Sequence, residues 1–266
     1  MTSVSDICKA LGQIAPVCLA ADWDNVGLLV GDRKSAVTHV MTCLTVTPET
    51  VAEAIDKQAG LIVTHHPFPF SPLKTITTDT NIGAMLWQLA QAGISVYSAH
   101  TAFDSAAAGI NQQIAEGLNL KDIKPLEPIE DSQLAATEGL GAGRCGTVEF
   151  ASLAELVQKA KSTFNIESLH IVGDITQPLK KVGIACGSAG EFIRCASRQG
   201  CDVLITGEAR FHTCLEARAL GIAMILLGHY ASERFALDNL AATLANQFSE
   251  LTVWASTDEQ DPLTLH

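Results

Sequence analysis

The sequence predicts an α/β fold made of two similar domains, each with a sheet covered by helices. Apolar runs of strand length alternate with segments of helical periodicity from one end of the chain to the other, which is typical of sheets with helices on both faces. The length of 266 residues suits two half-size domains. A composition that is 47% hydrophobic and 17% charged supplies a core and excludes a disordered chain.

In the first half, the predicted elements are a helix from residue 4, a strand over 40–46, a helix from 48, a strand over 61–64, a helix over 80–92 and a strand over 94–98. Ser3 can cap the first helix. The segment Thr47-Pro48-Glu49 is a helix start, because it combines a cap, a proline in the first turn and an early acid. Gly60 and Gly93 end the two later helices.

In the second half, strands are predicted over 146–150, 182–186, 202–206 and 222–227, with helices between them and a long helix after His229. Ser152 and Glu155 predict a capping box at one helix start. Residues 121–143 break the rhythm with polar residues, prolines and glycines, so we place the two domains at 1–125 and 126–266. Whether the last helix packs back on the first domain stays open.

Net charge and cysteine content narrow the class of protein. Seventeen basic and 29 acidic residues give a formal charge of −12, which argues against nucleic acid as a partner. The eight cysteines include no CxxC pair, which excludes a zinc ribbon. The longest aliphatic run covers residues 222–227, far short of the roughly 20 residues of a membrane span. Since the first residues also lack a secretory pattern, we expect a cytoplasmic protein with reduced thiols and no membrane partner.

The main functional signal is a set of imidazoles and carboxylates at the ends of four predicted strands. In chain order these are His65 with His66, His100 with Asp104, Glu208 with His212, and His229 with Glu233. Open α/β sheets bind their ligands outside the carboxyl ends of the strands. This combination of side chains suits two divalent metal ions with bridging oxygens.

The first two pairs each have a second interpretation. Adjacent histidines in a strand point to opposite faces, so His65 and His66 reach one metal only if the chain turns there. Pro67 keeps His66 extended, which lets the pair address two metals; a solvated turn is the alternative. We expect His100 and Asp104 in a strand-to-loop turn, where the aspartate can serve as a cap.

The other two pairs share a spacing of four residues. In a helix this spacing places His229 and Glu233 on one face, and likewise Glu208 and His212. Helical metal ligands use this spacing, but so do ordinary surface pairs. Each pair is therefore weak evidence by itself, and the set of four strand ends carries the prediction.

Two glycine-rich segments imitate known motifs. Residues 141–146 fit GxGxxG by letter, but they follow a polar linker and precede a strand, so we interpret them as a junction loop rather than a dinucleotide site. Residues 187–190 follow a strand as a nucleophile elbow does, but Cys186 stands where the elbow requires glycine. We interpret this turn as structural or anion-binding, ahead of Ser188 as a nucleophile.

Seven segments, in this order, resemble the Nif-three-like family, whose bacterial members are called GTP cyclohydrolase 1 type 2 homologues. They are Asp24-Asn-Val-Gly-Leu28, Thr64-His-His-Pro67, His100-Thr-Ala-Phe-Asp104, Gly141-Ala-Gly-Arg-Cys-Gly146, Gly187-Ser-Ala-Gly190, Thr206-Gly-Glu208 with His212, and Gly228-His-Tyr-Ala-Ser-Glu233. Together they extend over about residues 22–234, nearly the whole chain.

The resemblance implies two similar α/β domains, a dinuclear metal site in the cleft between them, and a homohexamer. The implied metal ligands are His65, His66, Asp104, His229 and Glu233, with the two carboxylates as natural bridges. His100, Glu208 and His212 would then lie around the ligands and hold or move protons.

We therefore expect a metal-dependent hydrolase with two divalent ions, from the set Zn, Fe, Mn, Ni and Mg. Its substrate would be a small polar molecule, phosphorylated or nucleotide-like, and Glu208 or His212 would transfer the proton. Two alternatives stay open. One is a non-catalytic metal-binding, metal-delivery or regulatory protein, and the other is a serine hydrolase that uses Ser188.

Overall fold

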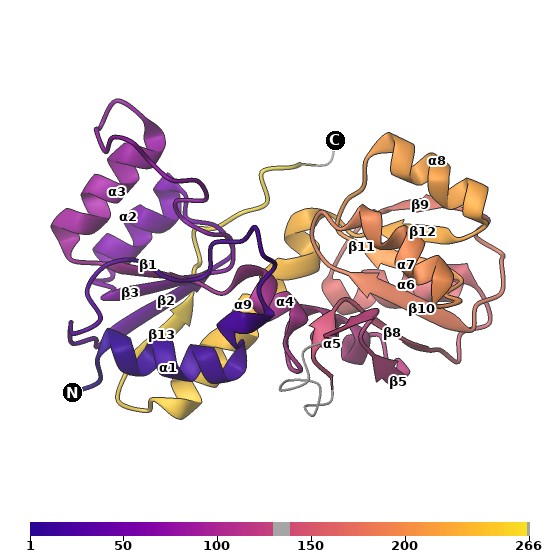
Figure 1. Ribbon diagram of the computed structural model, residues 1–266, viewed down its shortest axis with the longest axis horizontal. Coiled ribbons are helices and arrows are strands. Elements are labelled where there is room, and N and C mark those ends of the chain that lie inside the picture. The colour runs from indigo at the N-terminus through magenta and orange to yellow at the C-terminus, as the bar shows by residue number, and fades with distance from the viewer. Residues whose placement is uncertain (130–138, 265–266) are drawn as a thin grey trace. The chain divides into compact units, whose positions relative to one another are not determined.

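The computed structural model describes residues 1–129 and 139–264. The chain forms two compact units (Figure 1). The first unit contains Met1–Phe103 and Ala236–His266, and the second contains Asp104–Phe235, whereas the sequence places the division near residue 125. Residues 130–138 of the predicted junction lie outside the described residues. The mixed α/β class predicted from the sequence is confirmed.

The first unit is built on a five-stranded sheet with strand order β1-β4-β3-β2-β13. The strands are β1 (Gly27–Val30), β2 (His39–Cys43), β3 (Leu61–Thr64), β4 (Ser95–Ser98) and β13 (Thr252–Ala255). All neighbours pair in parallel except β1, which runs antiparallel to β4. Residues Leu61–Thr64 of β3 are buried throughout, as expected for a central strand covered on both faces.

Helices cover both faces of this sheet. They are α1 (Val4–Ile14), α2 (Pro48–Asp56), α3 (Asn81–Ala92) and the C-terminal part of α9 (His229–Gln247), with a 3-10 turn η1 (Val17–Leu19) after α1. Figure 1 shows α2 and α3 on one side of the sheet and α1 and α9 on the other. Three predicted helix ends are confirmed: Ser3 and Thr47 cap α1 and α2, and Gly93 ends α3 with φ +69°, a conformation that favours glycine. The prediction that Gly60 ends α2 is wrong, because this helix ends at Asp56 and Lys57 is its C-cap.

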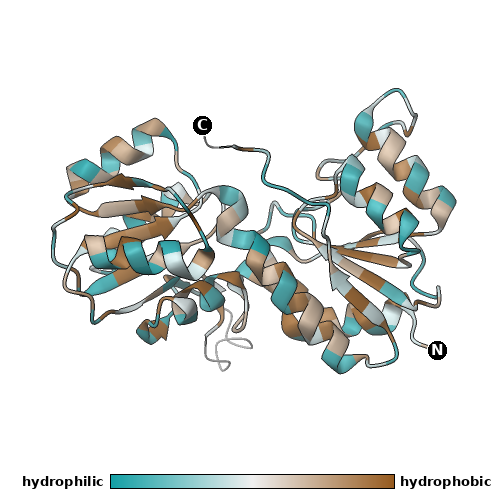
Figure 2. Ribbon diagram, turned by 180° about the vertical axis from the view of Figure 1, so that it is seen from behind, coloured by the Kyte–Doolittle hydropathy of each residue, from teal (hydrophilic) through white to brown (hydrophobic). Residues whose placement is uncertain are grey.

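The second unit is built on a six-stranded sheet with strand order β5-β8-β10-β11-β12-β9. The strands are β5 (Lys121–Lys124), β8 (Arg144–Thr147), β9 (His170–Val172), β10 (Lys181–Ala185), β11 (Val203–Thr206) and β12 (Ala223–Leu226), and β6 (Glu127–Pro128) pairs separately with β7 (Gly141–Ala142). The central strands β10, β11 and β12 are parallel. They are also the hydrophobic strands of this unit (Figure 2).

The helices of the second unit are α5 (Ile110–Gly117), α6 (Leu153–Phe164), α7 (Ile193–Arg198) and α8 (Phe211–Leu220). Two further helices are divided between the units: α4 (His100–Ser105) at Asp104 and α9 at Ala236. A 3-10 turn, η2 (Gly190–Phe192), precedes α7. One core cluster joins Ile193 and Ala196 of α7 and Ala217 of α8 to Leu204 and Met224 of the sheet. Within the described residues, no helix has both the length and the apolar character that a membrane crossing requires.

The capping box predicted at Ser152 and Glu155 is wrong. Ser152 is the residue before α6, but its side chain makes no capping hydrogen bond. The first amides of the helix bond to a neighbouring loop instead, because Leu153 N donates to Gln177 O at 3.0 Å and Ala154 N donates to Ile175 O at 2.9 Å. Tertiary contacts thus satisfy the donors that a serine cap would have satisfied.

The GxGxxG-like segment forms β7 and β8 rather than a loop, and no helix follows it directly. Its Arg144 is fully buried, and all five guanidinium N–H groups are satisfied. They donate to Gln112 Oε1 and to the carbonyls of Ala106, Gly139, Gly141 and Gly143, at 2.6–2.9 Å. Burial lowers the pKa of Arg144 to about 10, so the group stays charged at neutral pH. We interpret it as a structural clamp on this turn.

Candidate metal centre

Three imidazoles gather at the carboxyl ends of β3 and β4 in the first unit. One ligand-capable atom of each of His65, His66 and His100 lies within 4.8 Å of the others. The ring centroids of His65 lie 5.2 Å from those of both His66 and His100. His65 is fully buried. The adjacent histidines therefore do turn to a common point, which the sequence left open.

Backbone contacts account for this turn. His65 N donates to Cys43 O at 3.0 Å and His66 N donates to Leu44 O at 2.9 Å, so the chain beyond β3 still follows the strand beside it. His100 N donates to His65 O at 3.1 Å. His100 begins helix α4 with a positive φ of 25°, which corrects the predicted strand-to-loop turn for His100 and Asp104.

Polar partners orient two of the three rings. Nδ1 of His66 lies 2.8 Å from the hydroxyl of Thr45, and Nδ1 of His100 lies 2.7 Å from Oδ1 of Asp24. A partner on Nδ1 fixes the orientation of the ring and directs Nε2 to act as the ligand atom, which is how metal-binding histidines are held in proteins. The carboxylate of Asp24 only accepts, so it also selects the tautomer of His100 with a proton on Nδ1. The His66 and His100 environments therefore fit metal coordination.

Asp24 is a second anchor that connects two segments of the first unit. Its carboxylate also accepts hydrogen bonds from the backbone N and the hydroxyl of Thr101, and its side chain is fully buried. Burial by itself raises the pKa of Asp24, but the hydrogen bonds from Thr101 and His100 outweigh it, and the pKa is lowered. Asp24 is therefore a carboxylate that holds the His100 imidazole in one orientation.

The C-terminal segment supports the His66 side of the cluster. The Glu259 carboxylate accepts from Leu44 N at 2.9 Å and from Thr45 N at 2.7 Å. Thr45 is the residue whose hydroxyl meets the His66 ring. A chain of contacts thus leads from residue 259 to a candidate metal ligand through one turn after β2.

The second unit places one imidazole between two carboxylates. Nδ1 of His229 lies 3.0 Å from Glu208 Oε1, and its Nε2 lies 3.2 Å from Glu233 Oε2. The hydrogen bond to Glu233 raises the pKa of His229 to about 9, with burial acting against it and Glu208 adding to it. Glu233 is buried and Glu208 is half exposed. The predicted helical pair His229 and Glu233 is confirmed as a contact.

The turn after β10 closes around these groups. Gly187 has φ +65°, and a Cβ at this position would lie 2.2 Å from Glu233 Oε1 and 3.5 Å from His229 Nε2. Only a glycine allows the backbone this close to the carboxylate. Gly187 N donates to the hydroxyl of Ser232 at 3.0 Å, and this hydroxyl donates to His229 O at 2.8 Å.

Asp104 lies in the same unit and is held from two sides. The Cys186 thiol donates to Asp104 Oδ1 at 3.1 Å, and Asn111 bonds both the Asp104 carbonyl and Cys186 N. Burial raises the pKa of Cys186 well above its usual value, and the charges of Asp104 and Glu233 add to this. Cys186 is therefore a neutral thiol that donates to a candidate bridging carboxylate.

His212 and Ser188 lie apart from these contacts. Glu208 precedes α8 and His212 is in its first turn, so the prediction that they share one helical face is wrong. His212 is exposed, with its ring 5.7 Å from that of Phe211, and its proton-transfer role stays a prediction. Ser188 is exposed, and within the described part of the chain no hydrogen bond joins it to an imidazole, so a serine nucleophile gains no support.

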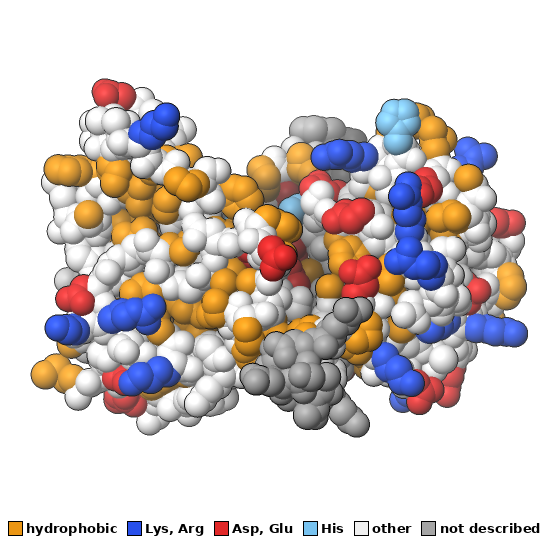
Figure 3. Space-filling view, viewed as in Figure 1, with side chains coloured by type: hydrophobic (Ala, Val, Ile, Leu, Met, Phe, Trp, Pro, Cys, Tyr) orange, Lys and Arg blue, Asp and Glu red, His pale blue; other side chains and the backbone are white. Residues whose placement is uncertain are grey.

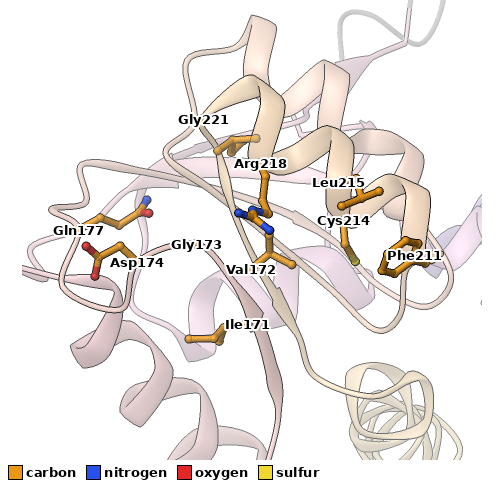
Figure 4. A pocket seen from close by; sticks show the side chains of 11 residues that line it. Ile171, Val172, Gly173, Asp174, Gln177, Phe211, Cys214, Leu215, Arg218 and Gly221 are labelled. Atoms are coloured by element: carbon orange, nitrogen blue, oxygen red, sulfur yellow. The ribbon is translucent and has the colours of Figure 1, made fainter.

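A cavity of about 660 Å³ lies elsewhere in the second unit, between β9 and α8. Figure 4 shows Phe211, Cys214, Leu215 and Arg218 of α8 on one side and Ile171, Val172 and Gly173 on the other. None of the site residues predicted from the sequence lines it. The candidate chemistry and this hollow are therefore separate features of the unit.

Known proteins are similar to this chain over almost its whole length. Residues 2–262 match the model of the family described as Duf34/NIF3 (NGG1p interacting factor 3). A Clostridium perfringens protein named GTP cyclohydrolase 1 type 2 homolog is 33% identical over 262 residues, which cover 97% of this chain and 98% of the relative. A Helicobacter pylori protein named GTP cyclohydrolase 1 type 2 is 33% identical over 252 residues, which cover 94% of this chain and 95% of the relative.

A solved structure is also similar to this chain over its whole length. The crystal structure of Staphylococcus aureus protein SA1388 has a TM-score of 0.89 with 27% sequence identity, and the similarity covers 100% of this chain and 99% of that one. The fold, the ordered motifs and the family match therefore lead to one conclusion: this chain belongs to the Duf34/NIF3 family.

Proposed function

We propose that this protein binds two divalent metal ions and uses them to hydrolyse a small polar, phosphorylated or nucleotide-like substrate. The observation that carries the proposal is the imidazole cluster, in which the rings of His66 and His100 are oriented through Nδ1 by Thr45 and Asp24. Metal-binding histidines are expected to have such partners on Nδ1, whereas histidines in a solvated turn do not require them.

We propose that five side chains hold the ions: His65, His66, Asp104, His229 and Glu233. The mixed imidazole and carboxylate donors suit Zn, Fe, Mn or Ni, and Mg less well. When bound, such ions lower the pKa of water and polarise a substrate oxygen. His100 would hold its place beside the ligands through Asp24.

Glu208 favours catalysis over mere metal storage. Its carboxylate meets His229 Nδ1, yet its side chain is 53% exposed, whereas that of Glu233 is 4% exposed. A carboxylate that touches the site and also reaches solvent can accept a proton from substrate or water and release it. The name of the Helicobacter pylori relative makes guanine nucleotides the first substrates to test.

The test is elemental analysis of full-length protein purified without chelators, beside Asp104→Asn and Glu233→Gln. Both substitutions keep the side-chain volume and remove the charge. We expect close to two divalent ions per chain, lost in both variants and retained in Glu191→Gln, which alters an exposed carboxylate of the second unit. Protein that is folded but contains no stoichiometric metal would contradict the proposal.

Hydrolysis is tested separately. Turnover of phosphorylated and nucleotide-like compounds should disappear with a chelator and return with the metal found by analysis. Turnover that persists in metal-free protein would exclude metal-dependent hydrolysis. Metal bound at full stoichiometry without hydrolysis of any compound in the screen would instead favour the metal-binding or metal-delivery role.

A further inference from the structure

Two exposed aromatic side chains stand beside the imidazole cluster. Trp23 is 67% exposed and Phe70 is 58% exposed, although large aromatic rings gain stability from burial. The ring centroid of Trp23 lies 5.9 Å from that of His100, and that of Phe70 lies 6.5 Å from it. Both rings therefore lie at the edge of the candidate metal centre. They are not buried in the core of the fold, and the proposed hydrolysis assigns them no role.

The arrangement of the rings is specific. Trp23 and Phe70 have centroids 6.5 Å apart and planes inclined by 47°, and each is nearly perpendicular to the His100 ring, at 78° and 85°. A planar guest between two parallel rings needs about 7 Å, twice the contact distance of about 3.5 Å. A guest here would therefore stack on one ring and meet the edge of the other, next to His100.

The segments that carry the rings are held in place without a ligand. Asn25 Nδ2 donates to Pro69 O at 3.1 Å, which joins the Trp23 turn to the Phe70 loop. Ala21 N donates to the Thr101 hydroxyl at 3.0 Å, and Asp24 N donates to Ala21 O at 2.9 Å. A ligand that binds here meets rings already positioned, which reduces the ordering cost of binding.

Exposure alone would not justify a site. Figure 3 shows hydrophobic side chains at the surface over α2 and α3 as well, and Trp87 of α3 is 50% exposed. Among the described residues, Trp87 makes no ring contact with a histidine, whereas Trp23 and Phe70 both lie against one imidazole of the candidate centre, that of His100. This convergence separates the two rings from ordinary surface residues.

We infer that Trp23 and Phe70 form a platform for the planar heteroaromatic ring of the substrate, of the kind that a purine base presents. Stacking on such a platform holds the ring beside His100 and directs the rest of the molecule toward the histidines. The inference rests on the proposed function for the identity of its ligand as substrate, but ring binding itself requires no metal.

The experiment measures binding of adenosine and guanosine to the full chain by calorimetry, with and without prior chelator treatment. Nucleosides carry the ring but no phosphate, and ribose 5-phosphate serves as the probe without a ring. The variants are Trp23→Leu and Phe70→Leu, with Trp23→Phe as the conservative exchange. Trp87→Leu is the matched control, because it removes another exposed tryptophan of the same unit, with 50% of its surface exposed against 67% for Trp23.

We expect nucleosides to bind in both preparations. Loss of one stacking partner should weaken binding by about 5- to 150-fold in Trp23→Leu, which corresponds to 1–3 kcal/mol per stacked base. Phe70→Leu should weaken it as well, Trp23→Phe should retain most of the affinity, and Trp87→Leu should bind as the parent does. Binding of ribose 5-phosphate should not respond to any of these changes.

Three results would overturn the inference: no nucleoside binding in either preparation, equal affinity in Trp23→Leu and the parent, or leucine variants that alter only the sedimentation of the protein. The last would identify the rings as a contact between copies of the chain. Ring binding that depends on Trp23 in a protein without metal or turnover would contradict the proposed function alone. Metal-dependent turnover with no role for Trp23 would contradict the platform alone.

Discussion

Glu53 of α2 is a buried carboxylate with several hydrogen-bond donors around it, and Glu53→Gln tests what holds the C-terminal segment. The side chain is 1% exposed. It accepts from Lys57 Nζ at 2.7 Å, from Trp254 Nε1 at 3.0 Å and from the backbone N of Thr257 at 3.1 Å. Asp258 N at 3.2 Å, the Thr257 hydroxyl at 3.1 Å and the Ser256 hydroxyl also donate to it. Glutamine would lose the charge and would turn a donor toward these donors.

The pKa of Glu53 gives the size of its contribution to the free energy of unfolding. Burial by itself raises the pKa of Glu53, but the hydrogen bonds from Lys57, Ser256 and the backbone lower it from 4.5 to about 2. At about 1.36 kcal/mol per pKa unit, this difference corresponds to roughly 3 kcal/mol of folding free energy. Because the pKa is lower in the folded state, this contribution is complete above pH 4.5 and is lost as the pH falls from 4.5 to about 2.

Tryptophan fluorescence during urea unfolding is the measurement, since all three tryptophans, at positions 23, 87 and 254, lie in the first unit. We expect Glu53→Gln to be less stable than the parent by about 3 kcal/mol at pH 7, and the two to converge as the pH approaches 2. Glu49→Gln, an exposed glutamate of the same helix, should change stability far less. A difference below about 1 kcal/mol at pH 7, or an equal difference at pH 7 and pH 2.5, would refute this account of the carboxylate.

Three further predictions concern the metal centre, each measured as metal affinity by competition with a chromogenic chelator. Asp24→Asn should weaken binding by up to about 10-fold, because the amide no longer fixes the His100 ring that lies against the ligands His65 and His66, while Asp22→Asn, at an exposed neighbour, should leave it unchanged. Glu259→Gln should weaken binding in the same direction but less, since it acts through Thr45, and an unchanged affinity would count against that relay. Gly187→Ala should displace the Glu233 carboxylate and lower affinity at least as strongly as Asp24→Asn. Gly200→Ala, at φ +72° in open space, is its control for backbone strain alone.

Local features of the fold could be predicted from the sequence because local physics determines them. The strand over 61–64 is found at the predicted residues, since four consecutive apolar or β-branched residues behind a glycine admit little else. The helix predicted over 80–92 ends at Gly93 as expected, through the left-handed conformation of that glycine. The helix that begins at Pro48 follows from its threonine cap and proline.

Features that depend on distant residues could not be predicted. Ser152 has the pattern of a capping box, but the amides it would cap are bonded by residues 175 and 177, which the sequence gives no means to place. Strand β2 ends at residue 43, and its pairing partner β13 begins at residue 252, which is 209 positions later. A short apolar segment of four residues near the C-terminus carries no signal of that pairing.

The same limit applies to the candidate site. The four strand ends identify His65, His66, His229 and Glu233 because ligands of open sheets gather there. Asp24 and Glu259 could not be identified from position, since they meet residues 76 and 215 positions away. Asp24 had a weak signal, as the first residue of one segment shared with the family. Glu259 had none, because an acid in a polar tail is ordinary.

These distant contacts connect metal binding to the folding of the C-terminal segment. Glu53 clamps residues 254–258, the next residue bonds Leu44 and Thr45, and Thr45 meets His66. Glu53 lies on α2, and within the described residues its side chain bonds Lys57, Trp254 and residues 256–258 rather than a histidine. Loosening the C-terminal segment would nevertheless free the turn that orients His66. Coupling between two events is reciprocal. If the ions bind as we propose, an ion held by His66 should therefore stabilise this segment by the same free energy that the segment contributes to binding.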